Sequence, residues 1–393
     1  MKAVLQALAL TLAVQAVTSM AMIAPSVMAP VAAADLGLEA KGIGWFVALE
    51  YLCAMLSGLA CSAMIVRLGA VRVCQICVAL AAAGLFLATG AILPLIFAAA
   101  AAIGAGYGLV NPVSSHILAR SAPRQMMSLI FSIKQTGVPV GGALAGALVP
   151  VMVLTLGWRW SAAALAVFCL AAVSAIQTLR TAEPAVAYPA TKGAAAGFFA
   201  PLRLVVTNAS VLELALVSMI YGSAQLSLIA YFVTYLNLEL GYGLVSAGLI
   251  YSTAHAAGIV GRIAWGAMAD RWLPPRAMLG LLGLVMAGSG AGVAAFSVTW
   301  PLSAVIAVSA VYGASAVGWN GVYLAEVARC APAGQVGAIT GGTQFLTFVG
   351  ALLAPPLFGA VAGLIGSYGH AYLAFCVLPA LAGLRLLLAS ARA

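Results

Sequence analysis

The sequence predicts an all-α membrane protein with 12 transmembrane helices, arranged as two pseudo-symmetric six-helix bundles. Hydrophobic residues make up 65% of the 393 residues and charged residues only 6%, whereas a soluble domain has about 25% charged residues. The apolar runs are long and continuous, as in spanning helices, and do not alternate over about ten residues as barrel strands do. The two halves of the chain also share residues at matching spacings, which indicates an internal repeat.

The first half contains six apolar runs, each about as long as the 20 residues that cross a bilayer. We expect helices near 3–33, 43–66, 71–91, 94–119, 125–154 and 160–180. The first run resembles a signal peptide, because it ends in three alanines before Asp35. It is longer than a usual signal-peptide core and contains Gln15, Thr18 and Pro25. We therefore interpret it as the first spanning helix.

The second half contains six further apolar runs. We expect these helices near 209–237, 243–269, 277–297, 301–328, 335–364 and 371–390. Between the two sets, residues 181–208 form a long polar segment that contains proline and glycine. The pattern predicts an N-terminal bundle over 1–180, a cytoplasmic linker over 181–208 and a C-terminal bundle over 209–393.

The loop charges orient the chain, because an even number of spans places both termini on one side. The loops and ends on that side carry Lys2, Arg67, Arg72, Arg120, Arg124, Arg180, Lys192, Arg203, Arg271, Arg276, Arg329 and Arg392. The loops on the other side carry only Lys41 and Arg159. Since lysine and arginine are enriched in cytoplasmic loops, we expect both termini to be cytoplasmic and the protein to lie in the bacterial cytoplasmic (inner) membrane. This rule also explains the net charge of +9 without nucleic acid, because the basic residues do not form a tract.

The cysteines do not indicate a metal site or a redox site. Most of the seven lie inside apolar runs. Cys74 and Cys77 form a CxxC, but no second pair and no histidine cluster accompanies it. We interpret them as packing residues and expect no metal and no cofactor. Because no nucleophile elbow or phosphate loop is found either, we expect a protein that is not an enzyme. We also expect it to act as a monomer.

The internal repeat is visible at two sequence shifts. A shift of 204 matches Asp35-Leu36-Gly37 with Glu239-Leu240-Gly241, and Gly44 with Gly248. A shift of 209 matches Asn111 with Asn320, Arg120 with Arg329, Gln135 with Gln344, and Gly141 with Gly350. An insertion of five residues in or near the third helix of the second half reconciles the two shifts. Repeats of this kind predict a solute site between the halves, near the bilayer midplane.

One loop of the second half carries a recognisable motif. The stretch from Gly266 to Asp270 and Arg271, followed by Arg276, resembles the loop motif GxxxDRxGRR of the major facilitator superfamily. The matching loop of the first half keeps Arg67 but has Val66 at the acidic position, which weakens the charge latch that the motif implies. The resemblance extends over essentially the whole chain and implies a secondary transporter that works by alternating access. The expected latch residues are Asp270, Arg271, Arg276, Arg67 and Glu326.

Arg262 is the first residue expected to carry chemistry, because it lies inside a predicted helix. A charge near the bilayer centre costs about 2.5–3.5 kcal/mol on insertion scales, so it should face a cavity or a partner. The alternative is an arginine that reaches back toward Asp270, which lies about 12 Å away along the helix. An arginine followed four residues later by Gly266 also resembles the monocarboxylate and oxalate branches of the family, where the matching arginine holds the substrate carboxylate.

Lys134 is the second such residue. It lies about 15 Å along a helix from Arg124, which is too deep for its ammonium to reach the interface easily. We expect either a second anion-binding cation or an ion pair with Glu50 or Glu326. A lysine in the fifth helix resembles the bacterial cyanate-type and related organic-anion permeases.

Several polar side chains recur at helical spacing in the predicted spans. His255 and Tyr251 share a helix face with Arg262, and His255 is either a proton shuttle or a hydrogen-bonded core residue. Stripes on helices four and ten either line a cavity or link helices. The residues expected to contact the solute are Arg262, Lys134, Tyr107, Asn111, His255, Asn320, Tyr231, Gln15 and Tyr251.

Acidic residues are scarce, with eight in the chain. Glu213 and Glu326 lie near predicted cytoplasmic helix ends and fit a latch. Glu50 lies about eight residues into the second helix, and we expect Glu50, with His255, to carry any coupling proton.

These residues lead to two hypotheses about function. The first is a transporter of a small organic anion, in the simplest case a carboxylate, coupled to protons or to a counter-anion, because two buried cations face few buried acids. The second is a proton-driven exporter of drugs or metabolites, because the run from Gly137 to Gly142 resembles the antiporter motif GPxxGG.

Overall fold

The computed structural model of the chain describes residues 2–121, 127–177, 200–331 and 336–390. Regular structure in this part of the chain is entirely helical. Twelve of its helical segments are long and apolar enough to cross a membrane, from Val4–Asp35 to Tyr368–Ser390. They agree with the predicted spans to within a few residues at most ends, so the predicted fold class is confirmed.

The first six spans comprise seven helices, because the fifth span is interrupted. They are α1 (Lys2–Asp35), α2 (Ile43–Leu68), α3 (Ala70–Ala88), α4 (Leu93–Ser121), α5 (Met127–Gln135) with α6 (Gly137–Leu156), and α7 (Trp158–Gln177). A short 3-10 turn, Ala40–Gly42, connects α1 to α2.

The second six spans begin with α9 and include another interrupted helix. They are α9 (Ala209–Thr234), α10 (Leu244–Arg271), α11 (Pro275–Ala294), α12 (Leu302–Ala316) with α13 (Asn320–Cys330), α14 (Val336–Ile365) and α15 (Tyr368–Ser390). A π-helical turn, Tyr235–Glu239, extends α9. The short helix α8 (Ala200–Thr207) falls inside the expected linker and packs against α14. Residues 181–199 of that linker lie outside the described residues.

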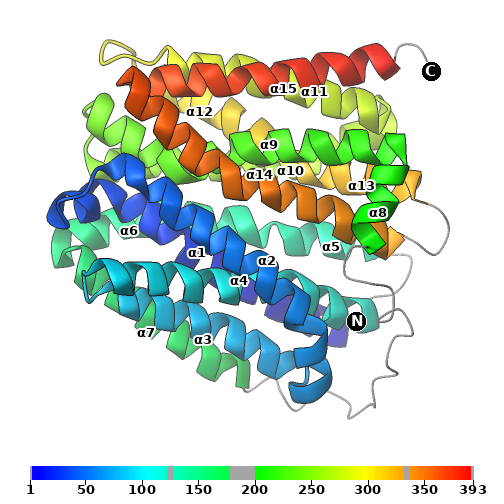
Figure 1. The fold of residues 1–393 in the computed structure, drawn as a ribbon, viewed down its shortest axis with the longest axis horizontal. Helices are drawn as coiled ribbons and strands as arrows, with labels where there is room; N and C mark the ends of the chain where they lie inside the picture. The colour runs from blue at the N-terminus through cyan, green and yellow to red at the C-terminus, as the bar shows by residue number, and fades with distance from the viewer. Residues whose placement is uncertain (1, 122–126, 178–199, 332–335, 391–393) are drawn as a thin grey trace.

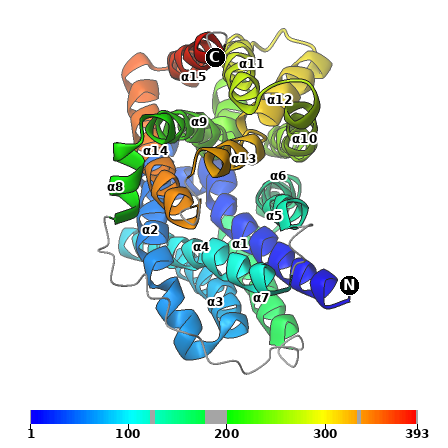
Figure 2. The ribbon, with the colours of Figure 1, turned by 90° about the vertical axis from the view of Figure 1, so that its right-hand side faces the viewer.

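The two halves lie side by side, with all spans roughly parallel to one axis (Figure 1). Seen along the helices, α1 and α4 of the first half and α9 and α13 of the second lie nearest the middle (Figure 2). The pair α2 and α14 flanks them on one side, and the pair α6 and α10 on the other. We call the end that holds Arg67 and Arg271 the Arg271 end, and the opposite end the Lys41 end.

The repeat predicted from the sequence has a matching backbone in the two halves. Gly37 and Gly241 both have positive φ, at 65° and 71°, a conformation that glycine adopts without strain. The acids just before them also have matching roles. Asp35 accepts hydrogen bonds from Trp158 and Arg159, and Glu239 accepts them from the turn before α15, including the backbone N–H of Tyr368. Each acid therefore fixes the turn after the fifth span of its own half.

The halves meet at the Lys41 end through a second repeated contact. Gly44 of α2 lies against the carbonyl of Pro355, and Gly248 of α10 lies against the carbonyl of Gly146. A side chain at either glycine would collide with that backbone. Tyr231 strengthens the first contact, because its hydroxyl contacts the carbonyls of both Pro355 and Lys41, at 2.7 and 2.9 Å. We call these residues the Lys41-end seal.

Candidate functional site

The fifth span is interrupted beside Lys134 for a local reason. Pro139 lacks the backbone N–H that would bond to the carbonyl of Gln135 in an unbroken helix. Thr136 bonds instead to Ile133, three residues back, at 3.0 Å. The carbonyl oxygen of Gln135 is therefore available to a donor from another helix.

Arg262 of α10 supplies that donor. Its Nη1 donates to the carbonyl of Gln135 at 2.7 Å, and its Nε donates to the carbonyl of Val317 at 3.0 Å. Val317 follows the last residue of α12, where the tenth span is interrupted. The carbonyl ends of helices carry a partial negative charge. Arg262 thus bridges two helix ends, one in each half, while Asp270 lies 3.8 Å from Arg329 instead.

A cavity of about 70 Å³ lies beside Arg262, between the two halves. One water molecule needs about 10–15 Å³ measured in this way, so the cavity has room for several waters or for a small solute. Its other polar lining residues are Asn111, Gln135, Gln225, Asn320, Gln344 and Thr347. Its aromatic lining residues are Tyr51, Tyr107, Trp319 and Phe348.

Lys134 lies behind one wall of this cavity. Its side chain is buried, and its Nζ donates to Oδ1 of Asn111 at 2.5 Å. Since an ammonium can only donate, the atom of Asn111 that it contacts must be the carbonyl oxygen. The amide nitrogen of Asn111 is then left for the cavity. The alternative of an ion pair with Glu50 or Glu326 is not seen for Lys134 in the described residues.

Gln225 is oriented in the same manner on the opposite wall. Its Oε1 accepts from the indole Nε1 of Trp319 at 3.2 Å and from Nδ2 of Asn320 at 3.3 Å. An indole N–H is a donor only, so this end of the Gln225 amide must be the oxygen. The amide nitrogen of Gln225 is left for the cavity.

Arg262, Asn111 and Gln225 therefore offer hydrogen-bond donors to the cavity, whereas Asn320, whose amide nitrogen bonds to Gln225, keeps an oxygen that can accept. Two of the five N–H groups of an arginine are used by the carbonyls of Gln135 and Val317, and the others remain for a ligand. Asn111 and Gln225 each contribute an amide nitrogen, because their oxygens are occupied. The residues that line the cavity include no aspartate or glutamate among the described residues. An electron-rich ligand such as a carboxylate matches this set of donors.

Glu50 lies just beyond the aromatic wall. It is 1% exposed, and neither of its carboxyl oxygens has a hydrogen-bond partner in the described part of the chain. It lines a separate void of about 10 Å³, the size of one water molecule, together with Ser26. Tyr51 and Tyr107 line both this void and the central cavity. The two tyrosine rings thus separate the carboxyl group from the donors.

Other predicted site residues lie outside the lining of the cavity. The ring of His255 packs against Gly142 and lies 4.3 Å from the ring of Tyr251, between their centroids. Tyr231 belongs to the Lys41-end seal, and Gln15 donates to a serine of its own helix, Ser19, at 3.3 Å. Solute contact by these four predicted residues stays a prediction.

Some lining residues were missed from the sequence. Tyr51 contacts Tyr107 with ring centroids 6.3 Å apart, and it contacts Phe348 at 5.9 Å. Tyr51, Phe348 and Thr347 all line the cavity, and none of them was predicted to do so. Tyr51 alone had a signal in the sequence, its position beside Glu50, because apolar and aromatic residues are common on every face of a spanning helix.

A comparison with protein-family models matches residues 11–355 to the Major Facilitator Superfamily. The chain belongs to the major facilitator superfamily. A search of curated proteins found no match. Membership confirms the resemblance to the superfamily seen in the sequence and identifies a multi-pass membrane transporter.

Solved structures share the fold of this superfamily member. A bacterial homologue of the human lysosomal transporter Spinster, in an inward-facing and unoccupied conformation, aligns with a TM-score of 0.78 at 15% identity, covering 99% of this chain and 97% of that one. A mutant of the nucleoside transporter NupG aligns with a TM-score of 0.79 at 14% identity, covering 98% and 99%. A D-xylose–proton symporter aligns with a TM-score of 0.75 at 15% identity, covering 98% and 96%. At these identities the likeness shows the fold alone.

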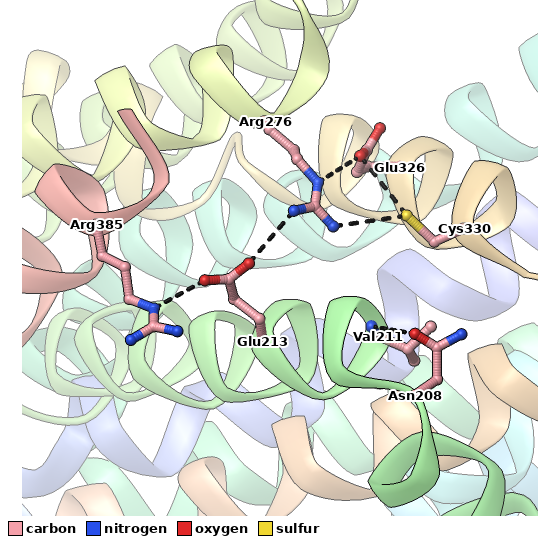
Figure 3. A network of polar contacts seen from close by, with 7 residues as sticks. All are labelled: Asn208, Val211, Glu213, Arg276, Glu326, Cys330 and Arg385. Carbon is pink, nitrogen blue, oxygen red and sulfur yellow. Dashed lines mark hydrogen bonds and ion pairs between the residues drawn. The ribbon is translucent and has the colours of Figure 1, made fainter. Parts of the chain in front are cut away.

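The superfamily loop motif leads into a charge network at the Arg271 end of the second half (Figure 3). Arg276 lies between Glu326, at 2.9 Å, and Glu213, at 3.3 Å, and Arg385 contacts the other oxygen of Glu213 at 2.7 Å. The network joins α9, α11, α13 and α15. Glu326 and Arg276, two of the predicted latch residues, form an ion pair, and no ion pair in the described residues involves Arg67 or Arg271. A latch role for these residues stays a prediction.

Proposed function

We propose that the protein moves a small organic anion, a carboxylate in the simplest case, by alternating access. The observation that supports this proposal is the orientation of the amides of Asn111 and Gln225, whose oxygens are held by obligate donors. With Arg262 they place N–H groups on opposite walls of the cavity. A carboxylate accepts two parallel hydrogen bonds from one guanidinium, which suits Arg262.

In the proposed mechanism the anion binds between the halves and neutralises the guanidinium of Arg262. That side chain also bonds to a helix end in each half, so its charge state affects contacts on both sides of the cavity. Neutralisation lowers the cost of enclosing the charge, and the halves then rock around the site. Lys134 contributes by orienting Asn111 and by adding positive potential behind it.

We further propose that transport is coupled to a proton or to a counter-anion. An unpaired carboxylate is costly to bury, so Glu50 is the acid best placed to carry a proton beside the cavity. The expected setting is the bacterial inner membrane, with both termini in the cytoplasm and the chain acting as a monomer.

The alternative is a proton-driven exporter. It draws on the run from Gly137 to Gly142, in which Gly141 packs against the backbone of Ala16 in α1. An exporter of cationic lipophiles needs an acid in its binding site. The described cavity lining has none, and Glu50 lies behind Tyr51, which favours the anion.

Uptake of labelled carboxylates into proteoliposomes, with and without a pH gradient, tests the proposal. We expect uptake of at least one small carboxylate by the wild type, none by Arg262→Ala, and wild-type uptake by Arg203→Ala, which changes an exposed arginine of α8 outside the cavity lining. Carboxylate transport that persists in Arg262→Ala would overturn the proposed role of the site.

A further inference from the structure

A second and larger cavity lies at the Lys41 end, away from the proposed solute site. Its volume is about 800 Å³, within the range of small-molecule sites. It is bounded by the ends of α1 and α3, the starts of α2 and α4, and α14. Its walls are mostly apolar and include Met28, Phe46, Leu85, Ile96 and Phe97. It shares no lining residue with the central cavity in the described part of the chain.

This cavity opens on the surface that meets the bilayer. Three of its lining side chains are large, apolar and well exposed: Trp45 at 67%, Phe97 at 48% and Leu364 at 88%. In a chain that spans a membrane, exposed apolar side chains on the helices face lipid. The apolar groups next to this opening are therefore the acyl chains of the bilayer lipids.

The rim of the cavity carries one charge of each sign. Glu39 and Lys41 line it with their charged atoms 2.8 Å apart, and their side chains are 74% and 35% exposed. Trp45 and Trp158 also line it, and tryptophan is enriched at the level of lipid headgroups. Acyl chains in the cavity would thus place a headgroup beside this ion pair.

The charges select a headgroup. A headgroup that bears only negative charge would meet Glu39 as well as Lys41. A zwitterion places its phosphate beside Lys41 and its ammonium beside Glu39, and a primary ammonium, unlike a quaternary one, can donate hydrogen bonds to the carboxylate. We propose that this cavity binds a phospholipid with a primary-ammonium zwitterionic headgroup, of the ethanolamine type.

The bound lipid acts on the Lys41-end seal. The backbone carbonyl of Lys41 accepts the hydroxyl of Tyr231, and the stem of Lys41 lies along α14 at Gly363. A headgroup that holds Lys41 in place therefore also holds a contact between the halves.

Native mass spectrometry of the purified full-length protein tests this, with ethanolamine, choline and glycerol phospholipids of identical acyl chains. We expect the wild type to retain the ethanolamine lipid about 3- to 10-fold better than the other two, as one charge-assisted hydrogen bond at a half-exposed site allows. Glu39→Gln should abolish the preference over the choline lipid. The matched control is Arg159→Met, which removes another exposed ion pair at the same end, with Asp35, outside the cavity. It should keep the preference.

Equal retention of the three lipids by the wild type would show that acyl chains alone fill the cavity, and would overturn the proposal. A preference for the glycerol lipid, or an ethanolamine preference that survives in Glu39→Gln, would overturn it as well. The readout does not depend on transport, so it is independent of the solute.

Discussion

Replacing Arg262 by lysine keeps a positive charge beside the cavity but removes the planar guanidinium. In the structure this group bonds to the carbonyls of Gln135 and Val317 at 2.7 and 3.0 Å and still has N–H groups left for a ligand. An ammonium has its donors on one atom, so it cannot contact both helix ends and a carboxylate with the same geometry. If one charge-assisted hydrogen bond to the solute is lost, the cost is about 1.5–3 kcal/mol. That corresponds to a roughly 10- to 150-fold higher KM.

The assay is concentration-dependent uptake into proteoliposomes, with the melting temperature of each purified variant measured in parallel. The matched control is Arg203→Lys, because Arg203 of α8 is exposed and lies outside the cavity lining. We expect Arg203→Lys to keep the wild-type KM. A KM for Arg262→Lys within about twofold of wild type, at unchanged protein quality, would refute the role assigned to the guanidinium fork.

Three further predictions concern other parts of the site. Lys134→Met removes a buried charge and the donor that orients the amide of Asn111. The KM for uptake should therefore rise about tenfold, while the melting temperature stays the same or rises. An unchanged KM in uptake assays would contradict this role of Lys134. Glu50→Gln should abolish the stimulation of solute uptake by an inward proton gradient but leave solute counterflow intact. Accumulation of solute driven by the proton gradient in this variant would show that Glu50 does not carry the coupling proton. Gly44→Val places a side chain against the carbonyl of Pro355 and should loosen the Lys41-end seal. Ser252 of α10 lies at the other glycine contact of this seal, where its hydroxyl donates to the carbonyl of Ala143 in α6 at 2.7 Å. In a chain without its native cysteines, a cysteine at Ser252 should therefore react faster with an impermeant thiol reagent when Gly44 is valine; unchanged labelling would show that the seal tolerates the valine.

The sequence was sufficient for the spans and the repeat because both depend on local composition and spacing. Gly37 and Gly241 matched in sequence, and both adopt positive φ. Gly44 and Gly248 matched as well, and each packs against a carbonyl of the opposite half. Such positions tolerate only glycine, so the fold leaves a direct trace in the sequence.

The arrangement of the site depends on contacts between helices, which spacing does not contain. Arg262 and Lys134 were predicted as charges that need partners, but the partners that the structure gives them include a carbonyl of Gln135 and the side chain of Asn111. Both pairs join residues distant in sequence. The expected acid partners for Lys134 were chosen by charge alone, whereas the structure satisfies it with an amide.

Pro139 illustrates a signal that was present but not read. The proline predicts that the carbonyl of Gln135, four residues earlier, is left without its helical donor. What it cannot predict is which donor approaches. That depends on the packing of α10 beside α6, where Gly142 makes room for His255.

We propose that the cavity selects its ligand by offering donors to an acceptor-rich, negatively charged group. The most direct test measures uptake of a labelled carboxylate into wild-type proteoliposomes in the presence of a competitor. The two competitors are a small unlabelled carboxylate and the neutral primary amide of the same carbon skeleton, at matched concentrations. We predict that the carboxylate competes and that the amide is at least about tenfold weaker, since the amide replaces one acceptor oxygen by a donor. Equal competition by the amide, or stronger competition by the matching primary amine, would contradict the claim.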